Sequence, residues 1–153
     1  MNPETIGQTY RQLGSQGANP LKIVVMLYDV LLDDLRRAIE ALHACDIEKR
    51  TGEIQHALRV LEQLQGSLDM ERGGEPANNL EHLYSAVRAK LLEAHWKSSE
   101  ELLCRQIDLL RPVREAWEEA RIQQLNLEPR RTDQFAPAMP PPEMYGAGSE
   151  WRA

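Results

Sequence analysis

The chain is poor in the features that mark secreted and membrane-spanning proteins. Its two cysteines, Cys45 and Cys104, lie far apart without a CxxC motif, which is typical of reduced thiols, and we expect both to be small buried side chains. No run approaches the ~20 apolar residues that a membrane span requires, and the N-terminus lacks the basic and apolar segments of a signal peptide. The sequence therefore predicts a cytoplasmic protein without membrane insertion.

Positive charge and aromatic residues are scarce as well. The 153 residues carry a net charge of −6, so the chain has no obvious electrostatic means of holding a phosphate backbone, and we expect no nucleic-acid partner. Only 5% of the residues are aromatic, with a single phenylalanine, whereas the helix formers Leu, Ala, Glu, Gln and Arg are abundant. The composition predicts one all-α domain.

Four segments carry apolar residues at spacings of three and four, which predicts four amphipathic helices. The first begins at the N-cap Asn19, with Pro20 in the first helical position, and runs to about Ala44. Asp46 caps the second helix, which ends in the sequence DMERGGEP of residues 69–76. The first two helices are therefore joined by a short turn.

The third and fourth helices follow directly on each other. The third spans about residues 77–97, and Ser98 with Glu101 has the spacing of a capping box that starts the fourth. Pro112 removes one backbone hydrogen bond, but the apolar stripe continues in phase beyond it, so we expect a kink and not an end. Four helices with short connections predict an antiparallel up-down four-helix bundle.

The two ends of the chain lack this periodicity. Residues 1–18 are polar and interrupted by glycine, which predicts an N-terminal arm before a bundle of residues 19–128. Residues 129–153 contain five prolines and no helical period, which predicts a flexible, disordered Pro-rich C-terminal tail. A generic helical adaptor, one alternative function, would dock through the aromatic residues of this tail, Phe135, Tyr145 and Trp151.

The first helix has a second apolar stripe, nearly opposite its core stripe and two turns long. It consists of Ile23, Met26, Leu27 and Val30. If this helix packs on two neighbours, both stripes are buried; otherwise the second stripe lines an exposed groove for the amphipathic helix of a partner. Methionine adapts to imperfect surfaces and suits such a groove. The second interpretation makes these four residues the candidate partner-binding site.

Two Glu-x-x-His pairs, Glu40 with His43 and Glu53 with His56, have the spacing of ligands in di-iron bundles. Such ligands must point into the bundle, yet these residues lie off the core stripes, so we expect no metal site. No GxSxG, Walker or Rossmann pattern appears, and we expect neither catalytic residues nor a cofactor. A di-metal bundle enzyme remains the alternative from another class, and elemental analysis tests it.

Three stretches together resemble the flagellar secretion chaperones of the FliS family. They are ANPLKIVVMLYD, LDMERGGEPANNLEHLY and LLRPVREAWEEA, in that order and spacing, within a resemblance that covers residues 6–121. The matching residues fall into four groups: Asn19, Pro20, Met26, Leu27, Tyr28 and Asp29; Glu71, Arg72, Gly73, Gly74 and Glu75; Asn79, Leu80, Leu83 and Tyr84; Ala116 and Trp117.

This resemblance implies a cytoplasmic chaperone that binds the disordered C-terminal segment of flagellin in hydrophobic grooves and prevents premature polymerisation. The chaperone would deliver flagellin to the export gate of the flagellar type III apparatus, without a cofactor and without catalysis. The resemblance also implies that the N-terminal arm, here with Ile6 and Tyr10, covers or flanks the groove. Because a long apolar surface waits for substrate, the empty chaperone is expected to form a weak homodimer.

Overall fold

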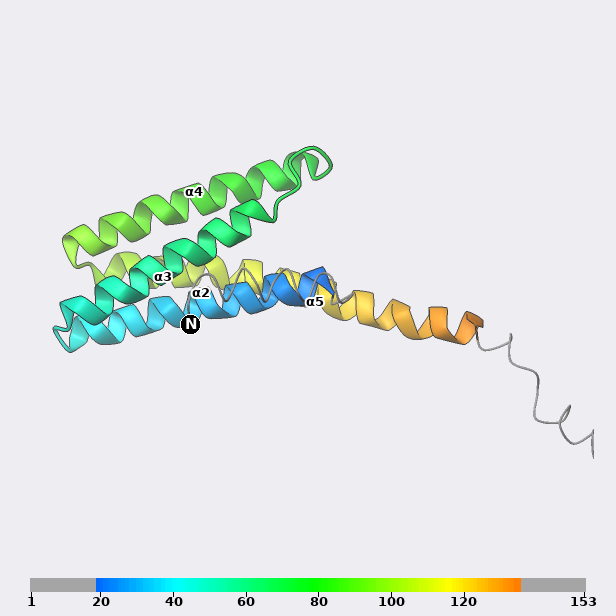
Figure 1. Cartoon of the computed structure of the whole chain (residues 1–153), viewed down its shortest axis with the longest axis horizontal. Coiled ribbons are helices and arrows are strands. Elements are labelled where there is room, and N and C mark those ends of the chain that lie inside the picture. The colour runs from blue at the N-terminus through cyan, green and yellow to red at the C-terminus, as the bar shows by residue number, and fades with distance from the viewer. Residues whose placement is uncertain (1–18, 136–153) are drawn as a thin grey trace, which may run out of the picture. The chain divides into compact units, whose positions relative to one another are not determined.

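A computed structural model of the chain describes residues 19–135, and side chains are described for residues 19–127. The helices are α2 (Pro20–His43), α3 (Ile47–Gly66), α4 (Gly74–Lys97) and α5 (Glu100–Phe135), and the described residues contain no strand (Figure 1). The predicted all-α four-helix bundle is confirmed.

Several predicted segments lie outside the described residues. These are the N-terminal arm of residues 1–18, with Ile6 and Tyr10, and the end of the tail, with Tyr145 and Trp151. The chain divides into two compact units, residues 1–118 and 119–153. The bundle is the first unit, and the second unit contains the end of α5.

The first two helices begin at the predicted caps. The side chain of Asn19 accepts a hydrogen bond from the backbone nitrogen of Leu21 at 2.9 Å. The side chain of Asp46 accepts one from the backbone nitrogen of Lys49 at 3.0 Å. Each cap satisfies one of the amide groups that a helix N-terminus leaves without a partner, so both predictions are confirmed.

The predicted capping box at Ser98 and Glu101 is wrong. Ser98 ends α4 with a left-handed backbone at φ 49°, and a residue in that conformation closes one helix rather than starting the next. The cap of α5 is Ser99, whose hydroxyl accepts a hydrogen bond from the backbone nitrogen of Leu102 at 3.2 Å. The two helices are therefore joined by two serines with different functions.

Helix α5 passes through Pro112 without ending, as predicted, and Val113 and Trp117 beyond it still pack against the core. It also runs past Pro129 to Phe135, into residues predicted to be a non-helical tail. Extending an existing helix requires no new nucleation, and the residues after Leu127 include Glu128, Arg130 and Arg131, which are good helix formers. The periodicity of apolar residues therefore placed the helix end too early.

Polar contacts show that α2 and α3 are antiparallel neighbours. The carboxylate of Asp34 contacts His56, and one turn later along α2 the guanidinium of Arg37 contacts Glu53, which lies one turn earlier along α3. Because one chain position advances while the other retreats, the two helices run in opposite directions.

Helix α5 also lies along α2 and runs antiparallel to it. The guanidinium of Arg114 donates to the carboxylate of Asp29 at 2.9 Å, and the imidazole of His43 lies 2.8 Å from the carboxylate of Glu100. From the first pair to the second, the position advances along α2 and retreats along α5, so the two helices run in opposite directions. Within residues 19–135, none of the helices combines the length and the apolar character that a membrane span requires.

The core lies between the inward stripes of all four helices, and Tyr28, Leu31, Leu35 and Ala38 of the predicted α2 stripe are fully buried in it. Cys45 does not join this core. It is exposed in the turn after α2, with φ 54°, while Cys104 is half-buried, and both thiols are free. The prediction that both cysteines are buried is wrong for Cys45, because a turn residue between two helix ends has no helix to cover it.

Candidate functional site

The four residues of the predicted second stripe on α2 fall into two groups. Ile23 and Leu27 are 5% and 4% exposed and belong to the core. Met26 is 44% exposed, and Val30 is half-buried. The stripe therefore has a buried floor and an exposed edge, and only Met26 and Val30 can offer a partner much surface without rearrangement of the bundle.

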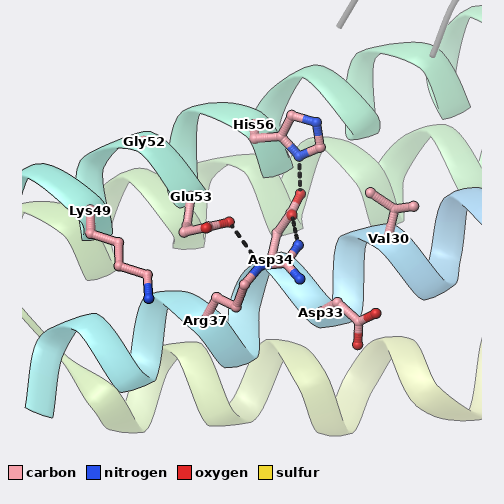
Figure 2. A pocket seen from close by; sticks show the side chains of 8 residues that line it. All are labelled: Val30, Asp33, Asp34, Arg37, Lys49, Gly52, Glu53 and His56. Atoms are coloured by element: carbon pink, nitrogen blue, oxygen red, sulfur yellow. Dashed lines mark hydrogen bonds and ion pairs between the residues drawn. The ribbon is translucent and has the colours of Figure 1, made fainter. Parts of the chain in front are cut away.

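Val30 also lines a polar cavity of about 660 Å³ between α2 and α3, which we call the α2–α3 pocket (Figure 2). Its lining consists of Val30, Asp33, Asp34, Arg37, Lys49, Gly52, Glu53 and His56. The exposed stripe on α2 thus continues into a charged hollow beside α3. The sequence did not predict this hollow, because each of its polar residues lies off a core stripe when its own helix is considered alone.

Asp34 is the buried centre of the α2–α3 pocket. Its side chain is fully buried; one oxygen accepts from Nη2 of Arg37 at 2.8 Å, and the other lies 2.6 Å from Nδ1 of His56 (Figure 2). Burial raises the pKa of the Asp34 carboxyl above its ordinary value, although His56 and Arg37 act in the opposite direction. The two partners compensate part of the desolvation of the carboxylate, and the network holds α2 against α3.

The Glu-x-x-His pairs do not converge. Glu40 and His43 are exposed, whereas Glu53 and His56 bind groups of α2. Among the residues that the structure describes, no three His, Cys, Asp or Glu side chains are grouped as a metal site would need.

A second cavity, of about 300 Å³, lies in the bundle where α2 begins and α3 ends. We call it the apolar pocket. Its lining is mainly apolar and consists of Pro20, Leu21, Val24, Ser67, Leu68, Asp69, Gly73, Pro76, Ala77, Leu80, Tyr84 and Trp117. Leu21, Val24, Leu80 and Trp117 are half-buried, so part of their apolar surface faces the cavity.

Tyr84 and Trp117 connect the apolar pocket to the core. The hydroxyl of Tyr84 lies 2.8 Å from that of Tyr28, and the two rings are tilted by 56° with centroids 6.3 Å apart. Burial raises the pKa of both hydroxyls, so both remain protonated at neutral pH. This bond satisfies polar groups that would otherwise be costly to bury, and it fixes the ring of Tyr84 beside the cavity.

Gly73 shapes the rim of the apolar pocket. Its backbone nitrogen donates to the carbonyl oxygen of Asp69 at 2.7 Å, which closes the turn before α4. A Cβ on Gly73 would lie 2.5 Å from that same oxygen and 2.5 Å from the Cβ of Ala77. Only glycine allows the turn to approach α4 this closely.

Replacing Gly73 by alanine is therefore expected to lower the free energy of unfolding by about 1–3 kcal/mol, because backbone atoms must shift to admit the methyl group. Urea unfolding followed by circular dichroism measures the loss. Gly66→Ala is the matched control, since a Cβ on Gly66 meets no atom within 4 Å. Equal stability of the two variants would contradict the steric argument.

The apolar pocket was not predicted as a site, since the spacing of its leucines and its valine is that of core residues in amphipathic helices. A signal was nevertheless present in the sequence. Residues from all four groups that carry the family resemblance line this one cavity: Pro20, Gly73, Leu80, Tyr84 and Trp117. Motifs that are distant in the sequence thus meet at one place in the fold.

Comparison with known proteins identifies the family of this chain. Residues 3–124 match the family described as FliS, Flagellar protein FliS. The chain belongs to this family. A FliS relative of Pseudomonas aeruginosa, named flagellar secretion chaperone FliSB, is 34% identical over 101 residues, which is 66% of this chain and 80% of the relative.

Other FliS relatives are similarly distant. The flagellar secretion chaperone FliS of Campylobacter jejuni is 32% identical over 66% of this chain and 79% of the relative. That of Vibrio cholerae is 29% identical over 67% of this chain and 75% of the relative. The FliS match includes both cavities, since their lining residues all lie between Pro20 and Trp117.

Proposed function

We propose that this chain is a cytoplasmic export chaperone for flagellin. It binds the disordered C-terminal segment of flagellin, prevents premature polymerisation and delivers flagellin to the export gate of the flagellar type III apparatus. The proposal is supported by membership of the FliS family and by relatives that are named flagellar secretion chaperones. It requires no cofactor and no catalytic residue.

The observation that carries the proposal is the apolar pocket lined by the family-matching residues. Its half-buried Leu21, Val24 and Leu80 offer apolar surface to a side chain from another molecule. A cargo segment that is disordered when free loses conformational entropy on binding, so it needs apolar burial to compensate. The pocket provides such burial at one place on the bundle.

One cavity of about 300 Å³ accommodates only a few side chains, whereas a segment that folds on binding needs a large contact surface. The exposed edge of the second stripe provides a further contact. We assign Met26 and Val30 to direct contact with flagellin, with Ile23 and Leu27 supporting them from the core. The cargo segment would therefore extend over more than one face of the bundle.

The N-terminal arm is followed in the sequence by residues that line the apolar pocket. Asn19 connects the arm to α2, and the next two residues, Pro20 and Leu21, line the apolar pocket. We propose that Ile6 or Tyr10 covers the apolar surface of the empty chaperone and leaves it when flagellin binds. Deleting residues 1–18 would then increase the rate of cargo association.

The direct test is calorimetric titration of the full chain with a peptide of the flagellin C-terminal segment. We expect binding at micromolar concentration or below, with a negative heat-capacity change from apolar burial. Absence of binding at tens of micromolar, by a chain with the circular dichroism of a folded bundle, would overturn the proposed function.

A charge on the exposed edge of the stripe is expected to weaken binding. Met26→Glu should reduce the affinity for the flagellin peptide about tenfold, because a carboxylate then replaces apolar contact area. The melting temperature should change little, since Met26 is 44% exposed. Gln55→Glu is the control, as Gln55 is exposed on α3, lines neither cavity and gains the same charge. Equal affinity of both variants would remove Met26 from the interface.

A further inference from the structure

Gly52 has no explanation within the chain. It lies inside α3, where glycine is less favourable than alanine in a helix, and it lacks the positive φ that would require glycine. A Cβ built on Gly52 meets no atom within 4 Å, so packing does not require glycine either. Its side of the helix instead faces the α2–α3 pocket, where a Cβ would occupy space available to another molecule.

Lys49 lies one turn before Glu53 and lines the same pocket. Within the described part of the chain its ammonium group has no ion pair or hydrogen bond, and Figure 2 shows it reaching over the cavity without an interaction to its neighbours. Lys49 is exposed, so this group is in water. Here it stands at the mouth of a concave surface, available to an incoming anion.

The acidic groups of the pocket are already paired inside the protein. Asp34 and Glu53 both bind Arg37, and Asp33 binds Arg36 at 2.8 Å. The charge without a partner in the pocket is therefore the positive charge of Lys49. A cargo carboxylate is complementary to this ammonium group. The complementarity is local to Lys49, because the lining as a whole has three carboxylates and two cationic side chains.

We propose that the α2–α3 pocket is a second contact site for the cargo, at which its backbone passes closely over Gly52 and one of its carboxylates pairs with Lys49. This inference rests on the proposed function, because it takes the occupant to be the flagellin segment. The pocket is contiguous with the exposed stripe through Val30, so one segment reaches both. The absence of a side chain on Gly52 permits the close approach.

The first test compares two glycines of α3 in the full chain. Gly52→Ala is expected to raise the melting temperature by about 2–4 °C, because alanine favours the helix, and to weaken binding of the flagellin C-terminal peptide about tenfold. Gly66→Ala also gains a methyl group in open space but lines neither cavity, so it should keep the affinity of the unmodified chain.

A Gly52→Ala variant that is more stable and binds equally well would overturn the proposal, since the glycine would then serve no contact. If the unmodified chain itself fails to bind the peptide, the proposed function is wrong. The two failures are therefore distinguishable.

The second test concerns the charge. Lys49→Ala should weaken binding about three- to tenfold at low salt and less at high salt, as expected for one ion pair that the bound cargo partly covers. A series of peptides in which each Asp or Glu becomes Asn or Gln should contain one that loses affinity for the unmodified chain but not for Lys49→Ala. If every peptide loses the same affinity for both proteins, Lys49 contacts no cargo carboxylate, and the proposal is wrong.

Discussion

Leu21→Glu is expected to weaken binding of the flagellin C-terminal peptide by more than about 100-fold while the bundle stays folded. Leu21 lines the apolar pocket and is half-buried, so a carboxylate at this position faces the cavity. If cargo filled the cavity, it would enclose that charge among apolar groups, and burying an unpaired carboxylate costs several kcal/mol. A loss of about 2.8 kcal/mol already corresponds to 100-fold in the dissociation constant.

The position of Leu21 makes the variant informative. It lies in the first turn of α2, which contains no acidic residue, and a negative charge there is favourable to the helix dipole. The substitution removes no fully buried side chain, since Leu21 is half-buried. Loss of binding with unchanged helicity would therefore reflect the pocket and not the fold.

Lys22→Glu is the matched control. Lys22 is the next residue in the same turn, is exposed, lines neither cavity and undergoes a larger change of charge. We expect it to change affinity less than threefold at physiological salt, where exposed charges are screened. Calorimetric titration gives both affinities, and thermal melts confirm folding. Tight binding by Leu21→Glu would mean that cargo does not enter the apolar pocket.

The sequence was sufficient for those parts of the fold that depend on local chemistry. The caps at Asn19 and Asp46, the turn to α3 and the buried face of α2 follow from side-chain hydrogen bonds and from a period of 3.6 residues. The end of α5 at Phe135 could not be predicted in this way. The last residues of α5 extend a helix that has already formed, and they carry no apolar stripe that would mark them as helical.

The cavities depend on how helices diverge, which periodicity does not encode. Leu21 and Leu31 both belong to the core stripe of α2 by spacing, yet Leu31 is fully buried and Leu21 is half-buried at the apolar pocket. The second stripe shows the same effect, since Ile23 is buried and Met26, three residues later, is exposed. Only the positions of the neighbouring helices decide which stripe residues retain surface for a partner.

Asp34 is the clearest case of a residue that sequence reasoning missed. It follows Asp33 directly, and both interrupt the apolar run of α2, but Asp33 is exposed and Asp34 is fully buried. The difference arises because α3 brings His56 within 2.6 Å of the Asp34 carboxylate. The partner lies on another helix and could not be assigned from the spacing within either one.

The Asp34–His56 contact leads to the second large prediction. His56→Ala is expected to lower the free energy of unfolding by about 2–4 kcal/mol, because it leaves a fully buried carboxylate with Arg37 as its remaining partner. Asp34→Ala should cost less, since the guanidinium of Arg37 is 45% exposed and is solvated without Asp34. The double variant should lose less than the sum, with a coupling of about 1–3 kcal/mol in urea unfolding. Strict additivity would contradict a direct contact between the two side chains.

The pH dependence of stability in these variants distinguishes the effect of the buried Asp34 charge from the effect of lost side-chain packing. Burial raises the pKa of the Asp34 carboxyl, and His56 lowers it, so removing His56 raises this pKa further. The Asp34 carboxyl of the folded His56→Ala variant therefore binds a proton more tightly than it does in the unfolded chain, where the pKa of an aspartate is about 3.9. The free energy of unfolding of this variant must therefore increase as the pH falls through the pKa of Asp34 in the folded state toward about 4. We expect His56→Ala to gain stability relative to the double variant between pH 7 and pH 4. A constant difference over that range would mean that the Asp34 carboxylate is solvated, and that the helices are held together without it.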